Sequence, residues 1–432
     1  KIHRPPFFPG GSRNFQTISA NLSATEVPRA TDVSDGRWDD ADDFQVKQAQ
    51  KDAERLMKKT KAPEKGSPGN LVSLSRKELE DLAVKYDQPA YRGKQIFDAV
   101  YKHGKRSIVD IVQVPKAWRE DLESSGVTLG RSEVHHIVTA DDGTVKMLLK
   151  LADNRVVETV GIPSKRTSDS KQRLTVCVSS QVGCPMRCTF CATGKGGFAR
   201  NLEPHEIVDQ VLTIQEHFGQ RVSHVVFMGM GEPMLNIPSV MAAHRSMNED
   251  LGIGARSITI SSVGVPNSLQ KLARHDLQST LAISLHAPDQ QLREQIIPSA
   301  KVYPLEALLE DCHQYFLATK RRISFEYTLL KGVNDSVEQA LALAKLLYKF
   351  NVAGHVNLIP YNTVDESDFQ RPTRAGVEAF KNALMKQKIE TSVRETRGLE
   401  AAAACGQLRN TFQKTPMAEE AIIEAFKKTL IA

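Results

Sequence analysis

The chain has 432 residues, 41% of them hydrophobic and 25% charged, which allows two domains or one large domain with additions. No apolar run is long enough to span a bilayer, so a helical membrane protein is excluded. The formal net charge of +6 is compatible with a polyanionic partner without indicating one, and six cysteines without a repeating framework suggest a reducing compartment.

Residues 1–68 do not show the pattern of a folded domain. The first acidic residue is Glu26, and the stretch before it contains several Arg and Ser residues. An acid-poor leader of this kind is similar to the end of an organelle transit peptide, which predicts a location in an organelle stroma or matrix. An ordinary disordered extension is the alternative, and it predicts a cytoplasmic protein. Residues 61–69 are rich in Pro, Gly and charge and predict a linker.

A small helical domain is predicted over residues 69–130. Apolar residues recur at helical spacing over 76–85, 92–102 and 115–122, and Ser75 is placed to cap the first of these helices. Basic residues flank the second helix. A packing module would show the same pattern.

A three-stranded β-meander is predicted over residues 131–165. Its strands are 134–139, 145–151 and 155–160, and Asp-Gly and Asp-Asn turn signals separate them. Glu158 lies in the last strand, where a carboxylate is more often a solvent-facing residue than a functional one.

Strands and helices alternate over residues 166–410, which predicts parallel βα units. The expected strands are 174–179, 222–228, 257–261, 279–284, 322–329, 355–359 and 390–394. The expected helices are 203–218, 237–248, 266–273, 289–296, 304–319, 336–350 and 373–387. About six such units suit a partial (β/α)6 barrel, whose chemistry sits at the carboxyl ends of the strands. Residues 411–432 are expected to form a C-terminal helix or tail.

Three cysteines, Cys184, Cys188 and Cys191, lie within eight residues in the loop after the first of these strands. Closely spaced thiolates suit zinc or an iron–sulfur cluster. A 4Fe–4S cluster usually takes four cysteines, so a run of three leaves one iron open to a small molecule. The alternative is a closed zinc site completed by Cys177 or by a distant residue.

The CxxxCxxC spacing is the fingerprint of radical S-adenosylmethionine (SAM) enzymes, and other motifs narrow the resemblance. In order along the chain they are Val176–Gly183, Gly229–Pro233, Ser284–Pro288, Asn357–Asn362 and Ala403–Leu408. Together they resemble the RlmN/Cfr family of radical SAM RNA methyltransferases, roughly over residues 70–410. With the leader, the resemblance predicts a plant organellar member located in the chloroplast.

The resemblance implies a radical SAM barrel with two cofactors, a 4Fe–4S cluster and SAM. Cys184, Cys188 and Cys191 would bind the cluster, and SAM would bind its open iron. The residues implied to contact SAM are Gly231, Glu232, Ser261, Ser284, Leu285, His286 and Asn362, with Ser262 as a substitute for Ser261.

The resemblance also implies three catalytic residues. Cys405 would take a methyl group from one SAM as a thiolate, and a radical made from a second SAM would activate that methyl group. Glu158 would help remove a proton from the adenine carbon. Cys177 would then release the product by forming a disulfide with Cys405. One departure from the family is that only Glu400 remains acidic between Gly398 and Cys405.

The expected activity is methylation of adenine C2 in large-subunit (23S-type) rRNA, with tRNA as a further substrate. The expected partners are RNA, bound with the help of the helical domain, and a flavodoxin- or ferredoxin-like electron donor, with the enzyme as a monomer. Methylation at adenine C8, as in Cfr, is an alternative that no residue excludes. The alternative from another class is a non-catalytic, zinc-stabilised RNA-binding or ribosome-assembly protein.

Overall fold

The computed structural model describes residues 69–165, 172–364 and 367–408. The predicted leader, all but the last residue of the predicted linker, and the predicted C-terminal tail lie outside the described residues.

The three predicted N-terminal helices are present. They are α2 (Arg76–Lys85), α3 (Tyr91–Tyr101) and α4 (Lys116–Ser124), with a 3-10 turn at Ile108–Asp110. Ser75 and Glu78 form a capping box, in which each side chain accepts a hydrogen bond from the backbone N–H of the other. Gly93 lets α3 approach α2 closely, because a Cβ there would lie 2.3 Å from the Glu80 nitrogen.

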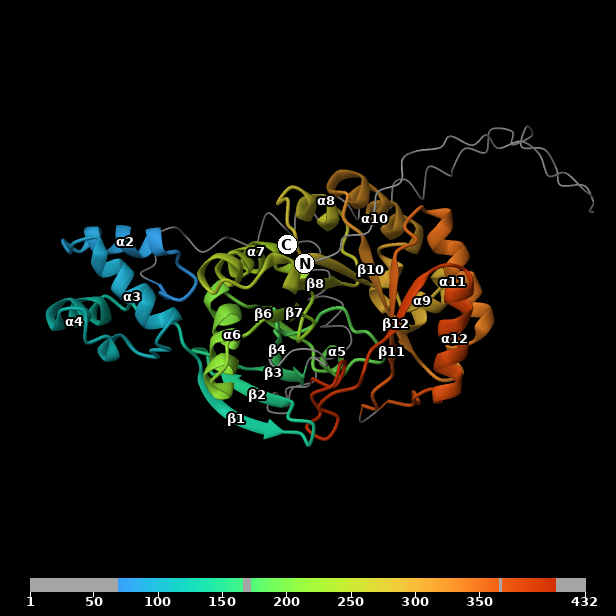
Figure 1. The fold of residues 1–432 in the computed structure, drawn as a ribbon, viewed down its shortest axis with the longest axis horizontal. Coiled ribbons are helices and arrows are strands. Elements are labelled where there is room, and N and C mark those ends of the chain that lie inside the picture. The colour runs from blue at the N-terminus through green and yellow to red at the C-terminus, as the bar shows by residue number, and fades with distance from the viewer. Residues whose placement is uncertain (1–68, 166–171, 365–366, 409–432) are drawn as a thin grey trace, which may run out of the picture. The chain divides into compact units, whose positions relative to one another are not determined.

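One ten-stranded sheet organises the rest of the described chain (Figure 1). In spatial order its strands are β1 (Glu133–Thr139), β2 (Val145–Lys150), β3 (Val156–Lys165), β4 (Gln172–Cys177), β7 (His224–Phe227), β8 (Ile258–Ser262), β9 (Thr280–Ser284), β10 (Ile323–Leu329), β11 (His355–Pro360) and β12 (Glu390–Val393). All strand pairs from β4 to β12 are parallel, as the alternating pattern predicts.

The predicted meander is also present, and it extends the main sheet. Strands β1, β2 and β3 pair in antiparallel fashion, and β3 is also antiparallel to β4. The domain boundary expected between residues 165 and 166 therefore falls between β3 and β4, two strands that pair with each other. Within the described residues β1 and β12 do not pair, so the sheet remains open, as a partial barrel requires.

Helices connect the parallel strands, as predicted. They are α6 (Pro204–Phe218), α7 (Ile237–Arg245), α8 (Ser268–Ala273), α9 (Gln290–Ile296), α10 (Leu305–Thr319), α11 (Val337–Lys349) and α12 (Arg374–Lys386), and α7 continues into a π-helical turn at Ser246–Asp250. Shorter 3-10 turns occur at Pro233–Leu235, Ala255–Ser257 and Pro298–Lys301. Figure 1 shows α11 and α12 on the outer side of β11 and β12.

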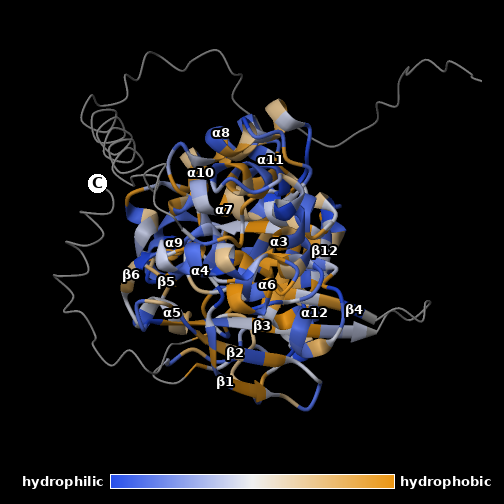
Figure 2. Cartoon of the chain, turned by 90° about the vertical axis from the view of Figure 1, so that its left-hand side faces the viewer, coloured by the Kyte–Doolittle hydropathy of each residue, from blue (hydrophilic) through white to orange (hydrophobic). Residues whose placement is uncertain are grey.

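Apolar side chains of the strands and of the inner helix faces form the main core, which also includes the N-terminal helices. Figure 2 shows these hydrophobic residues concentrated in the interior around α6 and the strands. Gly161 lets β3 approach α6, since a Cβ there would lie 2.6 Å from the Phe218 ring. No helix in the described part of the chain has the length and apolar character needed to cross a membrane.

A buried ion pair joins the segment after the helical domain to α6. The Arg131 and Asp209 side chains are 1% and 0% exposed and form an ion pair, and Arg131 also contacts Glu216 at 2.6 Å. Asp209 further accepts a hydrogen bond from the Ser132 backbone N–H at 2.7 Å. Because both groups of the inner pair are desolvated, each depends on the other for charge compensation.

Replacing Arg131 with Met is expected to lower the free energy of unfolding by about 3–5 kcal/mol, because Asp209 is left as an uncompensated buried charge. Urea unfolding followed by circular dichroism measures this. The double variant Arg131→Met, Asp209→Asn should recover most of the loss, since Asn is neutral and still accepts from Ser132. Equal losses in the single and double variants would contradict the assignment.

Candidate active site

The cysteine loop contains a small two-stranded sheet that the sequence patterns did not predict. It consists of β5 (Gln181–Gly183) and β6 (Phe198–Asn201), with the short helix α5 (Ala192–Lys195) between them. The Cys184 N–H donates to the Gly197 carbonyl at 2.8 Å, so the start of the loop is fixed against its end.

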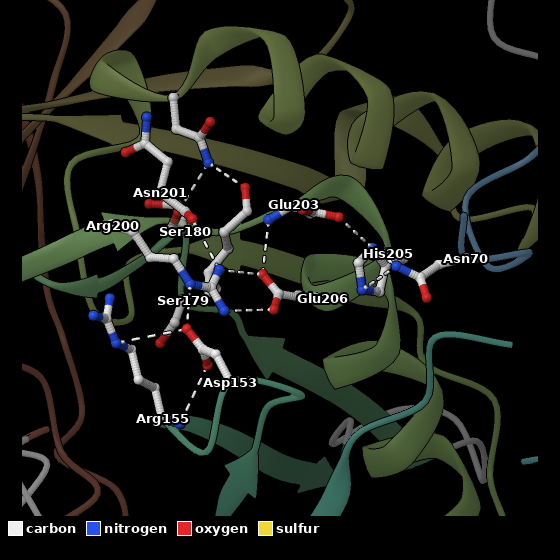
Figure 3. A network of polar contacts seen from close by, with 12 residues as sticks. Asn70, Asp153, Arg155, Ser179, Ser180, Arg200, Asn201, Glu203, His205 and Glu206 are labelled. Carbon is white, nitrogen blue, oxygen red and sulfur yellow. Dashed lines mark hydrogen bonds and ion pairs between the residues drawn. The ribbon is translucent and has the colours of Figure 1, made fainter. Parts of the chain in front are cut away.

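A polar network anchors the far end of this loop (Figure 3). Arg200 contacts both carboxylate oxygens of Glu206 at 2.8 Å and Asp153 at 2.7 Å. Glu206 is at the start of α6 and Asp153 is in the β2–β3 turn, so one guanidinium holds three elements together. The hydrogen bonds to Glu206 raise the pKa of Arg200 well above its usual range.

The three cysteines line one pocket at the carboxyl ends of the parallel strands, where the barrel geometry predicts the site. The same pocket is lined by six of the seven predicted SAM contacts, namely Gly231, Glu232, Ser261, Ser284, His286 and Asn362. Leu285 is fully buried behind the wall, and its backbone N–H donates to the Glu326 carbonyl at 3.0 Å.

Backbone contacts fix the Gly229–Pro233 turn against the cysteine loop. Gly231 has φ +105°, a region that favours glycine, and a Cβ there would lie 2.6 Å from Cβ of Gln181. The Gln181 amide oxygen accepts the Glu232 N–H at 2.8 Å. Burial raises the pKa of Glu232 to about 7, although the Val263 and Met234 N–H groups donate to its carboxylate.

The two candidate serines of β8 have different surroundings. The Ser261 and Ser284 hydroxyls lie 3.5 Å apart in the pocket wall, whereas the Ser262 hydroxyl accepts the Gly264 N–H at 2.9 Å. Ser262 is therefore engaged in its own turn, and Ser261 has the better placement for a ligand contact.

His286 is a neutral, fixed member of the wall. Its Nδ1 accepts the Thr328 N–H at 2.9 Å, and its ring packs edge-on against Phe190 of the cysteine loop. Burial lowers the pKa of His286 to about 3, so it carries no charge at neutral pH. It can position a ligand but cannot act as a proton shuttle there.

A second cavity adjoins the first and contains both predicted redox cysteines. Cys177, at the end of β4, and Cys405 both line it, and Cys405 lines the first pocket as well. Burial raises the pKa of Cys177 to about 12, and neither thiol forms a disulfide. Arg394 lines both cavities and contacts Met228 Sδ at 3.4 Å.

The loop that carries Cys405 is bonded directly to the cysteine loop. The Gly406 carbonyl accepts the Ala192 N–H at 2.8 Å, and the Leu408 carbonyl accepts the Thr193 hydroxyl at 2.6 Å. The Asn362 side chain donates to the Cys405 carbonyl at 3.1 Å. These bonds hold Cys405 at the pocket that Cys184, Cys188 and Cys191 also line.

Glu158 lies outside the lining of both cavities, and only 1% of it is exposed, so the solvent-facing interpretation is wrong. Its carboxylate lies 3.5 Å from the Lys146 amine. Lys146 also donates to the Ala402 carbonyl at 3.1 Å, in the loop that carries Cys405. On β3, Glu158 shares a face with Val160, which lies opposite Cys177.

The donor set suits a cluster better than a single zinc ion. Three thiols from one loop border a pocket that still has room and polar groups for a ligand, which matches a three-cysteine cluster with an open iron. Cys177 lines only the second cavity, away from the fourth position of a zinc site.

Comparison with known proteins agrees with this geometry. The Radical SAM superfamily matches residues 178–344. The crystal structure of a radical SAM methyltransferase from Sphaerobacter thermophilus has a TM-score of 0.73 at 38% sequence identity, over 79% of this chain and 99% of that one. Fold and site therefore define a radical SAM enzyme, with a 4Fe–4S cluster and SAM as its cofactors.

Curated relatives narrow the class to one family. "Probable dual-specificity RNA methyltransferase RlmN" of Acaryochloris marina is 56% identical over 341 residues, which cover 79% of this chain and 94% of the relative. The protein of the same name from Nostoc sp. is 58% identical over 339 residues, which cover 78% of this chain and 93% of that relative. The chain belongs to the RlmN family of radical SAM methyltransferases, which confirms the predicted family, fold class and cofactors. It also confirms the prediction of a SAM-dependent RNA methyltransferase over the non-catalytic alternative.

Several wall residues were not predicted from the sequence. Glu326, Thr328 and Tyr361 line the pocket, and Lys146 contacts Glu158. Glu326 and Thr328 are on β10, whose end was expected at the barrel mouth, so strand position alone could have indicated them. No local sequence signal distinguishes Lys146 from an ordinary strand lysine.

Replacing Gly231 with Ala is expected to weaken SAM binding at least tenfold, about 1.4 kcal/mol, because the added methyl group clashes with Gln181 and displaces the turn. Isothermal titration of the anaerobically reconstituted protein measures the affinity. The matched control is Gly332→Ala, at φ +70° with nothing within 4 Å of the new Cβ. Equal affinities in wild type and Gly231→Ala would contradict the role of this turn.

Proposed function

We propose that this protein methylates C2 of an adenosine in large-subunit rRNA of the 23S type, and also in tRNA, through a methyl group carried on Cys405. The observation that supports this most directly is that Cys405 lines both cavities. One cavity also contains the three cluster-type cysteines and the other contains Cys177. A protein that only binds RNA has no need of this arrangement.

The bound cofactors supply a methyl group from one SAM and, after one-electron reduction, a 5′-deoxyadenosyl radical from a second SAM. Cys184, Cys188 and Cys191 hold the cluster. Glu232, Ser261, Ser284 and Asn362 offer polar groups to SAM, and the neutral His286 fixes the wall between them.

Cys405 accepts the methyl group as a thiolate, since the thiol itself is a poor nucleophile. Arg394 lines both cavities together with Cys405 and brings a positive charge to them, which favours a thiolate over a thiol. The methyl carbon on Cys405 would give a hydrogen atom to the 5′-deoxyadenosyl radical and then add to the adenine carbon, so that a methylene group joins the base to the Cys405 sulfur. The unpaired electron left on this adduct would pass to a one-electron acceptor of the iron–sulfur class. The Glu158 carboxylate takes the proton from the substituted adenine carbon.

Cys177 then completes the reaction. Its sulfur attacks the Cys405 sulfur, so that an S–S bond forms and the bond between Cys405 and the methylene carbon breaks. The electron pair of the broken bond stays with the RNA, whose methylene carbon takes a proton and becomes the methyl group. The resulting disulfide must be reduced by an external dithiol before the next turnover.

The same proposal includes the partners and location. A flavodoxin- or ferredoxin-like protein delivers the low-potential electron, the enzyme acts as a monomer, and the helical domain helps to hold the RNA.

The acid-poor leader directs the protein to an organelle, the chloroplast. The cyanobacterial origin of several similar relatives supports that compartment. A leader–fluorescent protein fusion that stays in the cytoplasm would contradict the location.

Two measurements test the activity. Iron and sulfide analysis after anaerobic reconstitution should give about four irons per chain and a spectral change on adding SAM. Mass spectrometry of nucleosides from RNA treated with the enzyme should then show 2-methyladenosine. Finding 8-methyladenosine would instead establish the Cfr-type reaction, and one bound zinc without iron would overturn the radical mechanism.

Replacing Cys177 with Ala should trap the enzyme on its substrate, because nothing is left to break the bond between Cys405 and the RNA. A band containing protein and RNA is expected on denaturing gels, and nuclease treatment should remove it. Cys405→Ala should give neither the band nor product. Cys312→Ala, a fully buried thiol in α10 outside both cavities, is the matched control and should turn over. Normal turnover by Cys177→Ala would contradict its role.

Replacing Glu158 with Gln is expected to slow turnover by about 10²–10⁴-fold, the usual contribution of a general base. Methylation of Cys405 should persist, since that step needs no proton transfer from RNA, and peptide mass spectrometry checks it. Glu133→Gln on β1, an exposed residue, controls for the loss of a carboxylate on the meander. Unchanged turnover, or loss of Cys405 methylation together with turnover, would count against a base at Glu158.

A further inference from the structure

Arg293 is a buried cation that no carboxylate accompanies. It is 1% exposed on α9, and its Nη2 donates to the Val263 carbonyl at 2.6 Å and the Ser284 carbonyl at 3.4 Å. Its Nε donates to the Leu285 carbonyl at 3.2 Å. Within the described residues, no Asp or Glu lies within ion-pair distance of it.

Such a charge is costly to bury. Desolvating an ion costs several kcal/mol, and carbonyl dipoles alone offset only part of that. Burial lowers the pKa of Arg293 to about 10, so the group is still protonated at neutral pH. A buried and charged arginine without an acid indicates that another negative group belongs nearby.

The position of Arg293 identifies that group. Val263 and Ser284 line the pocket that the three cysteines border, so the guanidinium lies directly behind this wall. The Thr189 N–H and hydroxyl, next to Cys188, donate to the Ile296 carbonyl on the same helix at 3.0 and 3.2 Å. Helix α9 is therefore bonded to the cysteine loop and carries its cation to the Cys188 side of the pocket.

We propose that Arg293 raises the reduction potential of the 4Fe–4S cluster held by Cys184, Cys188 and Cys191, an inference that rests on the proposed function. Three thiolates make this site anionic, and one-electron reduction by an external low-potential donor adds one further negative charge. A fixed cation in a low-dielectric wall stabilises the reduced form more than the oxidised form. No bond forms or breaks in this step, so its energetics depend on the surrounding charges.

A purely structural role would use the same hydrogen bonds. Arg293 joins the ends of β8 and β9 through three carbonyls, and losing it could loosen the pocket. The structural role and the electrostatic role predict different effects when Arg293 is replaced by Gln or by Lys. Gln can still donate hydrogen bonds but has no charge, whereas Lys keeps the charge but loses the planar fork of the guanidinium.

The test is a redox titration of the reconstituted cluster, followed by electron paramagnetic resonance, in wild type, Arg293→Gln and Arg293→Lys. Arg293→Gln should disfavour reduction about tenfold, a shift of about 59 mV to lower potential for one electron. Arg293→Lys should stay at the wild-type potential. Arg321→Gln is the matched control: Arg321 also donates to a backbone carbonyl, of Ser279, but it lies just before β10 and next to the start of β9, at the opposite end of these strands.

An unchanged potential in Arg293→Gln would overturn the proposal, as would equal shifts in the Gln and Lys variants or in Arg321→Gln. If Arg293→Gln holds no cluster, Arg293→Lys decides: a cluster at wild-type potential supports the proposal, and a lowered potential or no cluster overturns it. Iron analysis of the wild-type protein distinguishes failure of this inference from failure of the proposed function, because a wild-type protein without a cluster refutes the proposed function itself.

Discussion

The hydrogen bonds between the Cys405 loop and the cysteine loop are the interaction on which the rest of the site depends. Residues 398–408 follow the last strand and belong to no helix or strand, so the sheet does not position them. Ala192 and Thr193 hold the carbonyls of Gly406 and Leu408 instead. These bonds start one residue after Cys191, so a loop more than two hundred residues away in sequence is fixed to the cluster-type cysteines.

The order of the strands supplies the second constraint. Parallel strands bring their carboxyl ends to one edge, and the chain places a polar or glycine-rich turn after each of them. This explains why the sequence could predict most of the pocket: the periodicity located the strands, and the family resemblance named residues at or just after their carboxyl ends as SAM contacts. Leu285 is the exception, since it follows a strand end but its side chain is buried behind the wall.

Other features could not be predicted, for physical reasons. The small β5–β6 sheet has strands of three and four residues, which are too short to show a period. The contact of Lys146 with both Glu158 and Ala402 depends on the antiparallel register between β2 and β3, and no local pattern encodes a register across strands. The resemblance indicated a role for Glu158, but the burial of its side chain came only from the structure.

Arg131 and Arg293, in the part of the chain that the structure describes, represent two kinds of buried charge. Arg131 and Asp209 compensate each other, and their pairing joins the segment after the helical domain to α6. Arg293 is held only by carbonyls and lies behind the wall of the pocket that Cys184, Cys188 and Cys191 border. Because buried charge is retained only where something opposes it, the first kind is complete within the protein and the second is completed by what the pocket binds. The cysteine loop is bonded to α9 through Thr189 and Ile296 and to the Cys405 loop through Ala192 and Gly406, so these three elements share one hydrogen-bonded frame around the pocket.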